Sequence, residues 1–355
     1  MRQWENNIRR VVPYTPGEQP KDESMIKLNT NENPYPPAPG VRRVLESFGT
    51  ESLRLYPDPT AGDLVSAIAE NHGLSADQVF AGVGSDDVLA MCFLTFFNSE
   101  KPLLFPDITY SFYDVWAGLY RIPYRCVPLD ENFGIRPEDY MQEAGGIIFP
   151  NPNAPTGIEL PPDQVEEIVR SHPDVIVIVD EAYIDFGGST CVPLIGKYDN
   201  LIVVQTFSKS RSLAGMRIGY AMGNPELIKA LNDVKYSFNS YTMSRVSIAC
   251  GAAAMKDRAY FEDTCRKITE TREWAKQELR SLGFLFGDSR ANFIFARHSF
   301  IPAEELFAVL RENHIYVRYF KKPRIDNYLR ITVGLREEME ALFAVLRDYI
   351  ASRAT

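Results

Sequence analysis

Lys209 lies just after an apolar run, in a segment where its amine could do covalent chemistry. The run LIVVQ (201–205) is typical of a strand covered on both faces, and open α/β sheets bind ligands beyond the carboxyl ends of such strands. Ser208 and Arg217 add a hydroxyl and a second cation to the same segment. An amine held there suits a lysine that forms an imine with a cofactor carrying an aldehyde and a phosphate. For Lys209 taken alone, a surface lysine after a strand is the alternative.

Asp180 follows five apolar residues, 175–179, at the end of another candidate strand. Burying a carboxylate without a partner is costly, so we expect Asp180 to pair with a cation such as a protonated pyridine nitrogen. Tyr183 lies three residues later and could hydrogen-bond an adjacent ring oxygen. The alternative is a Mg²⁺-binding aspartate of a nucleotide hydrolase, but the GxxxxGK[ST] loop that this requires is missing from the sequence.

A glycine-rich turn, Gly82 to Gly84, leads into an apolar-periodic helix that opens with Ser85 and Asp86. Glycine lets the backbone approach an anion, and a helix N-terminus offers free N–H groups and a positive dipole end. The turn lacks the third glycine of GxGxxG, which argues against a nucleotide-binding dehydrogenase. A phosphate site and an ordinary capped helix both remain open.

Two further side chains follow strand-like runs at the same expected sheet edge. Tyr110 comes after PLLFP (102–106) and could stack on a flat cofactor ring, or else pack in the core. Asn153 lies in the rigid loop NPNAPTG (151–157), where an amide could reach a phenolic oxygen, or where the segment is only a turn.

Arg318 and Arg330 lie on neighbouring candidate strands, IYVRYF (315–320) and YLRITVG (328–334). Strand arginines that face inward are costly, so a pair of them indicates an anion clamp between domains. Two solvent-facing arginines are the alternative.

The elements that must position these residues change in type along the chain. From about residue 41 helical patterns alternate with β-rich runs, which predicts an α/β fold with a mostly parallel, doubly wound sheet. The runs are VFAGVG (79–84), PLLFP (102–106), YRCVPL (124–129), GIIFPNP (146–152), VIVIVDEAYIDF (175–186), LIVVQTFSK (201–209) and IGYAMG (218–223).

After about residue 255 the pattern becomes α+β. A long amphipathic helix, 257–282, ends before Gly283, a plausible C-cap, and alternating runs follow at 291–298, 315–320 and 328–334. Helices are expected at 301–313 and 336–353. We therefore predict an N-terminal arm (1–40), a large domain (41–255) and a smaller C-terminal domain (256–355) that the arm completes.

The composition excludes several classes of protein. A net charge of -9 argues against nucleic acid as a partner. Four scattered histidines and five cysteines without a CxxC predict no metal site and free thiols of a reducing compartment. The longest apolar stretch, 88–97, is too short to span a bilayer, and the N-terminus has no apolar signal core. We expect a soluble cytoplasmic protein without a membrane partner.

Taken together, these segments resemble the fold type I pyridoxal-phosphate-dependent aminotransferases, and among them the histidinol-phosphate aminotransferase family. The resemblance covers nearly the whole chain and runs in the expected order. It rests on VVPYTPGEQ (11–19), KLNTNENPYPP (27–37), RLYPDPTAGDL (54–64) and TFSKSRSLAGMRIGY (206–220).

The resemblance implies a role for each site residue toward the cofactor, pyridoxal 5'-phosphate. Lys209 forms the imine and later moves protons, Asp180 pairs with the pyridine nitrogen, Tyr183 bonds the ring hydroxyl and Tyr110 stacks on the ring. The residues implied to hold the phosphate are Ser85, Asp86, Ser208 and Arg217.

The resemblance also implies partners and a reaction. Tyr56 would reach the phosphate bound to a neighbouring subunit, so the chain would be a homodimer with its arm acting across the interface. Arg330 would take a carboxylate, and Arg318 with Tyr14 the phosphate of histidinol phosphate. The implied reaction passes the amino group of histidinol phosphate to 2-oxoglutarate in ping-pong fashion, as a step of histidine biosynthesis.

One position departs from the family pattern. The family usually has asparagine before the proline of PTG, where this chain has Ala154, so Asn153 is the nearest amide for the ring hydroxyl. An aromatic amino-acid aminotransferase and a threonine-phosphate decarboxylase would keep every cofactor residue, and both remain alternatives.

Overall fold

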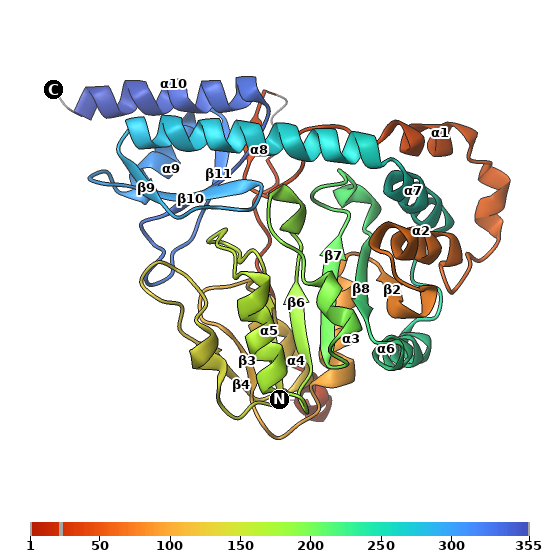
Figure 1. The fold of residues 1–355 in the computed structure, drawn as a ribbon. Helices are drawn as coiled ribbons and strands as arrows, with labels where there is room; N and C mark the ends of the chain where they lie inside the picture. The colour runs from red at the N-terminus through yellow and green to blue at the C-terminus, as the bar shows by residue number, and fades with distance from the viewer. Residues whose placement is uncertain (1, 21–23, 354–355) are drawn as a thin grey trace.

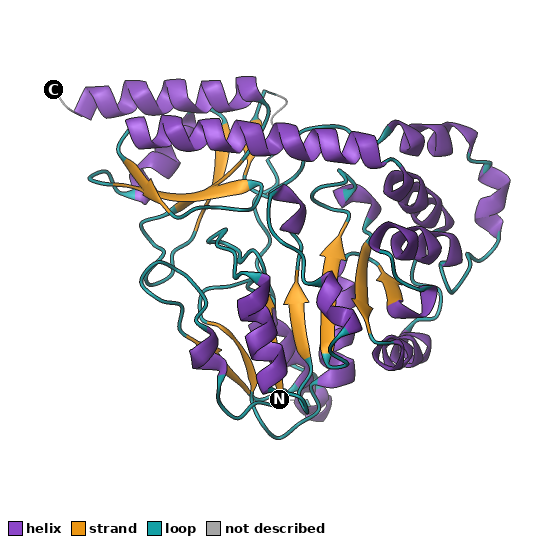
Figure 2. Ribbon diagram, viewed as in Figure 1, coloured by secondary structure: helices purple, strands orange, loops and turns teal. Residues whose placement is uncertain are grey.

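The apolar runs in the first two thirds of the chain form one large sheet. The computed structural model describes residues 2–20 and 24–353, and within them the strands form a seven-stranded and a five-stranded sheet (Figure 2). The larger sheet has the order β2-β8-β7-β6-β5-β3-β4. Its strands are β2 (Val79–Gly82), β3 (Leu103–Pro106), β4 (Tyr124–Val127), β5 (Gly146–Pro150), β6 (Val177–Asp180), β7 (Leu201–Thr206) and β8 (Gly219–Gly223). Only β8 is antiparallel to its neighbours, so the mostly parallel α/β sheet is confirmed.

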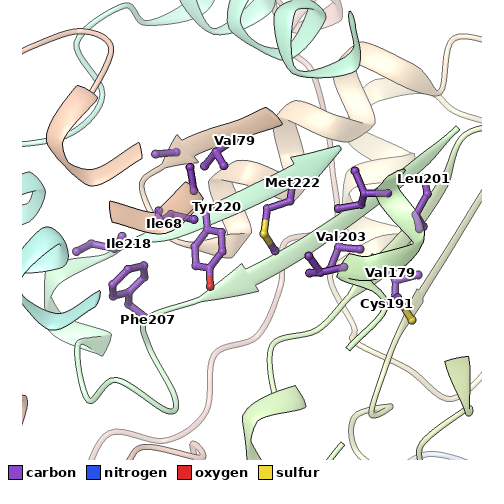
Figure 3. Close-up of a cluster of buried hydrophobic side chains, with 14 of the residues drawn as sticks. Ile68, Val79, Val179, Cys191, Leu201, Val203, Phe207, Ile218, Tyr220 and Met222 are labelled. Atoms are coloured by element: carbon purple, nitrogen blue, oxygen red, sulfur yellow. The ribbon is translucent and has the colours of Figure 1, made fainter. Parts of the chain in front are cut away.

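Successive residues of each strand point to opposite faces of this sheet, and helices bury both faces. Val79 of β2, Val203 of β7 and both Tyr220 and Met222 of β8 share one face with Ile68 (Figure 3). Helices α2 (Gly62–His72), α5 (Pro162–Ser171) and α7 (Arg245–Lys256) cover that face. Helices α3 (Ser85–Phe96), α4 (Tyr113–Tyr120) and α6 (Pro225–Phe238) cover the other. Helix α1 (Pro39–Ser47) packs on α7.

The smaller sheet combines the two ends of the chain. Its order is β1-β11-β12-β10-β9, and β1 pairs in parallel with β11. The strands are β1 (Ile26–Leu28), β9 (Phe284–Phe286), β10 (Phe293–His298), β11 (Ile315–Tyr319) and β12 (Leu329–Thr332). Helices α8 (Arg258–Ser281), α9 (Ala303–Glu312) and α10 (Arg336–Arg353) share its core, with α8 and α10 side by side (Figure 1).

The smaller sheet lies on the side toward which β6 and β7 point (Figure 1). The chain segments that leave these strands therefore meet the smaller sheet. The β-rich run expected at 175–186 is shorter as a strand, because β6 ends at Asp180 and a 3₁₀ turn forms at Ile184–Phe186. No helix in residues 2–20 and 24–353 is both long enough and apolar enough to cross a bilayer.

Candidate active site

A cavity lies where the two sheets face each other, and most of the expected residues line it. It takes side chains from the arm, from the segments after β2, β3, β6 and β7, and from β11 and β12. The predicted residues that line it are Tyr14, Ser85, Asp86, Tyr110, Asp180, Tyr183, Ser208, Lys209, Arg217, Arg318 and Arg330.

Lys209 is half-buried in this cavity, three residues beyond the end of β7. Its Nζ donates a hydrogen bond to the Thr30 carbonyl at 2.9 Å and lies 5.7 Å from the centre of the Tyr183 ring. The neighbouring Ser210 hydroxyl donates to Asp185 at 2.5 Å, which anchors the turn that carries Lys209. The amine is therefore held in the cavity by a neutral carbonyl.

Asp180 is buried at the end of β6 without a cationic partner in the described part of the chain. It accepts hydrogen bonds from the Tyr113 hydroxyl at 3.0 Å and the Ala182 N–H at 3.2 Å. Burial raises the pKa of Asp180 to about 7, because desolvation penalises the charged form more than these bonds favour it. A cationic ring nitrogen placed against this carboxyl would supply the missing charge.

The first turn of α3 forms a cradle with Arg217. Gly84 precedes the helix with a φ of 85°, and a Cβ there would lie 2.4 Å from Arg217 Nη2. Arg217 donates to the Ser208 hydroxyl and to the Asp86 carboxylate, both at 3.3 Å. The unpaired N–H groups of the helix start and this guanidinium suit a phosphate.

Tyr110 is fixed against this cradle. Its hydroxyl donates to Asp86 Oδ1 at 2.6 Å. Burial is the main cause that raises the pKa of Tyr110, and the charge of Asp86 adds to it. The Asp86 carboxylate therefore accepts hydrogen bonds from both Tyr110 and Arg217. An anion at the helix start would bind to the backbone N–H of Asp86 rather than to its side chain.

Asn153 does not reach the cavity as predicted. Its amide nitrogen donates to the Ile108 carbonyl at 2.9 Å and to Thr156 Oγ1 at 3.1 Å, and its oxygen accepts from Thr109. The methyl group of Ala154 lines the cavity instead. The Asn153 amide thus bonds to polar groups of its own loop and of the segment at 108–109, and its contact with a ring hydroxyl stays a prediction.

Arg318 and Arg330 lie directly opposite each other on β11 and β12. Arg330 donates to the Asn29 carbonyl at 2.9 Å, while its buried Nε has no partner in the described chain. Burial lowers the pKa of Arg330, and the charge of Arg318 lowers it further. No carboxylate among the described residues pairs with either guanidinium, so the pair is matched to an anion from outside the chain.

Tyr14 lies in the cavity, whereas Tyr56 lies on the exposed surface. Tyr14 lines the cavity and stacks on Phe112 with ring centres 4.1 Å apart. Tyr56 is 78% exposed, away from this cavity, and packs on Tyr241 at 4.7 Å.

Sequence reasoning named neither Tyr113 nor the contacts of Asn29, Thr30 and Asn31 as parts of the site. Residues 29–31 line the cavity, and Tyr113 reaches Asp180 from α4. The motif at 27–37 was the only available signal for the first group, and no spacing links Tyr113 to Asp180.

Comparison with known proteins places this site in a family. The sequence model of the family "Aminotransferase class I and II" matches residues 23–346. The chain belongs to the class I and II aminotransferases. The family uses pyridoxal phosphate, so the expected cofactor and enzyme class are confirmed.

Relatives of similar length within this family are histidinol-phosphate aminotransferases. Histidinol-phosphate aminotransferase of Lactococcus lactis subsp. cremoris is 51% identical over 350 residues, 99% of this chain and 98% of the relative. Histidinol-phosphate aminotransferase 2 of Dechloromonas aromatica is 53% identical over 97% of this chain and 98% of the relative. The expected family resemblance is confirmed.

Solved structures agree in fold. The crystal structure of histidinol-phosphate aminotransferase from Clostridium acetobutylicum has a TM-score of 0.84 at 22% identity, covering 92% of this chain and 100% of its own. The Sinorhizobium meliloti enzyme, in complex with pyridoxal-5'-phosphate, has a TM-score of 0.81 at 23% identity, covering 92% and 91%.

Proposed function

We propose that this chain transfers the amino group of histidinol phosphate to 2-oxoglutarate, giving imidazole acetol phosphate and glutamate. The observation that carries the proposal is the pair Arg318 and Arg330, which lines the cavity without a carboxylate partner among the described residues. Both a phosphorylated amine and a dicarboxylic oxo acid bring an anionic group to such a pair. The names of the relatives that cover nearly the whole chain support the same substrate.

The residues around Lys209 fit pyridoxal phosphate. When bound, the cofactor supplies a ring that takes up the electron pair left as the substrate's α-hydrogen departs as a proton. Asp180 holds a proton on the ring nitrogen by charge attraction. Lys209 would hold the cofactor through Nζ, with the aldehyde oxygen leaving as water, and its amine would carry the proton from the substrate carbon. Tyr183 and Tyr110 line the same cavity, where Tyr183 would donate to the ring oxygen and Tyr110 would stack on the ring.

The cofactor phosphate fits the start of α3. Ser85 and Asp86 of the first helical turn line the cavity together with Ser208 and Arg217, and Arg217 donates to the Ser208 hydroxyl at 3.3 Å. The Asp86 carboxylate would repel a phosphate, so its part is to orient Arg217 and Tyr110. On the opposite side Arg330 binds the carboxylate of the oxo acid, and Arg318 with Tyr14 binds the phosphate of histidinol phosphate.

We further propose a cytoplasmic homodimer in which Tyr56 and the arm act across the interface. Leu53 is 63% exposed, and Leu55, Tyr56, Phe238 and Tyr241 add further exposed apolar surface. Such surface is typical of an interface between subunits. The proposed division into an arm (1–40), a large domain (41–255) and a small domain (256–355) agrees with the strand content of the two sheets.

A second candidate is transamination of aromatic amino acids, favoured by the rings of Tyr14 and Phe320 in the cavity wall. A threonine-phosphate decarboxylase would also use the arginine pair. The three activities differ in their products, so one set of substrates separates them.

The test is a substrate panel scored by kcat/KM, because discrimination is expressed in that ratio. With 2-oxoglutarate as acceptor, histidinol phosphate should exceed phenylalanine by at least about tenfold. Arg318→Gln should lower that ratio by about tenfold or more, since it removes a charged hydrogen-bond donor. A preference for phenylalanine, or release of carbon dioxide from threonine phosphate, would contradict the proposal.

A further inference from the structure

Three successive residues of the arm contact three different groups of the site. The Asn29 carbonyl accepts from Arg330, the Thr30 carbonyl accepts from Lys209, and the Asn31 side chain contacts Tyr183. The first two contacts use backbone atoms. Asn31 is the residue whose side chain reaches a site group, with Nδ2 at 3.0 Å from the Tyr183 hydroxyl oxygen.

Asn31 is held by the small sheet rather than by Tyr183. It is 1% exposed and has a φ of 56°, a conformation that asparagine tolerates better than most residues. Its N–H donates to Thr332 Oγ1 at 3.1 Å, and its carbonyl accepts from Asn292 Nδ2 at 3.0 Å. The direction in which the side chain points is therefore imposed by β12 and by the residue just before β10.

The Thr332 hydroxyl also fixes which end of the amide faces Tyr183. Because Thr332 Oγ1 accepts from the Asn31 N–H, its own hydrogen is free to bond Asn31 Oδ1, which lies 3.0 Å away. That leaves Nδ2, which can only donate, toward the Tyr183 oxygen.

A phenol whose oxygen accepts a hydrogen bond must send its single hydrogen elsewhere. The Tyr183 ring is held edge-on by Phe293 at 5.1 Å and 89°. No described residue accepts the Tyr183 hydrogen, and Tyr183 lines the cavity. The hydrogen therefore points into the cavity as a donor.

Neither residue 153 nor residue 154 offers a free side-chain amide that could donate to the same ring oxygen. Ala154 presents a methyl group to the cavity, and the Asn153 amide is bonded to Ile108 and Thr156. Of these side chains, only Tyr183 is placed to donate to a ring oxygen.

We propose that Asn31 is a positioning residue that directs the Tyr183 hydroxyl hydrogen toward the ring oxygen of the bound cofactor. The proposal rests on the proposed function, because it needs pyridoxal phosphate linked to Lys209. It assigns to the arm a role in tuning the cofactor that is separate from substrate binding.

Asn31→Asp tests the direction of this bond. Aspartate keeps the shape of asparagine and also tolerates a positive φ, but its carboxylate cannot donate, so Tyr183 would turn its hydrogen away from the cavity. The ring oxygen would then lose its donor, and the nitrogen linked to Lys209 would keep its proton to higher pH. We expect the midpoint pH of the visible absorption change to rise, as in Tyr183→Phe, and pyridoxal phosphate to dissociate about fivefold more readily from the variant.

Asn33→Asp is the matched control for the added charge. The Asn33 amide donates to the Ser210 carbonyl at 3.1 Å and does not contact Tyr183. Asn31→Asp should shift the midpoint further than Asn33→Asp, and this excess should disappear in a Tyr183→Phe background. If Asn31→Asp fails to fold, Thr332→Val frees the amide by removing one hydroxyl and should raise the midpoint in the same direction.

Equal midpoint shifts in Asn31→Asp and Asn33→Asp would refute the proposed role of Asn31, as would an excess shift that persists in the Tyr183→Phe background. Either result would leave the proposed function untouched. A wild-type protein that shows no visible band with pyridoxal phosphate would instead refute the proposed function, and this proposal with it.

Discussion

At the residue scale, two adjacent buried carboxyl groups at the end of β6 titrate differently in the folded and unfolded chain. Asp180 is 4% exposed and accepts hydrogen bonds but has no cationic partner in the described part of the chain, and burial raises its pKa to about 7. The adjacent Glu181 is also buried, and burial raises its pKa to about 7 as well. Both groups are more easily protonated in the folded chain than in the unfolded chain, which makes the stability of the cofactor-free protein depend on pH.

The sign of that dependence follows from proton counting. Between about pH 4 and pH 7 the unfolded chain has released the proton of Asp180 while the folded chain still holds it, so stability falls as the pH rises. A pKa difference of about 3 units corresponds to at most about 4 kcal/mol of unfolding free energy. Asp180→Asn should therefore flatten the fall in Tm of the cofactor-free protein between about pH 5 and pH 7, measured by thermal unfolding. Identical slopes in wild type and variant would contradict this.

At the scale of elements, turns place side chains that regular structure alone could not. Gly84 turns the chain from β2 into α3 with a φ of 85°, and Arg217 occupies the space where a side chain would lie. Gly73 caps α2 with a φ of 66°, but nothing lies within 4 Å of its Cβ position. Both glycines have a positive φ, but Gly73 is in the left-handed helical region with a ψ of 31°, whereas Gly84 has a ψ of 162°, and their surroundings differ as well.

This difference gives a matched pair of substitutions. Gly73→Ala should destabilise the fold by about 1 kcal/mol, because alanine disfavours positive φ, and Gly84→Ala by about 1–3 kcal/mol, because its backbone region is open essentially to glycine alone. Only Gly84→Ala should displace Arg217, so only this variant should weaken pyridoxal phosphate binding, by about tenfold or more. Fluorescence titration of the cofactor-free proteins with pyridoxal phosphate measures the affinity of each variant, and thermal unfolding measures its stability. Equal loss of affinity in the two variants would argue against a phosphate cradle at Gly84.

The strands of the large sheet could be predicted because their apolar runs are continuous and long enough to recognise. β1 and β9, each three residues long, give no such pattern, and they form by pairing with strands distant in sequence. Side chains at strand ends, such as Asp180 and Lys209, were also predictable. Asn31 was not, since its contact with Tyr183 joins residues 152 positions apart. The direction of the Asn153 amide could not be predicted either, because it depends on how the loop closes on residues 108 and 109.

At the scale of the molecule, the cavity takes residues from both sheets, and exposed apolar surface is found before α2 and at the end of α6. Leu53, Leu55 and Tyr56 contribute to that surface together with Phe238 and Tyr241. Covering it with a second copy would bring Tyr56 toward the partner's site, as the family resemblance implies.

Leu53→Asp should therefore weaken the dimer, because a charge at an apolar interface must be desolvated. Phe300 is 91% exposed in the turn after β10 and serves as the control. Sedimentation should detect monomer for Leu53→Asp at concentrations where wild type and Phe300→Asp are dimeric. A dimer that survives Leu53→Asp unchanged would place the interface elsewhere.

The central claim is that Lys209 binds the cofactor covalently. It is tested by incubating the protein with pyridoxal phosphate, reducing it with borohydride and locating the modified lysine by peptide mass spectrometry. We predict modification at Lys209, loss of the visible band in Lys209→Ala and loss of transamination in the same variant. Modification at another lysine, or normal turnover by Lys209→Ala, would contradict the claim.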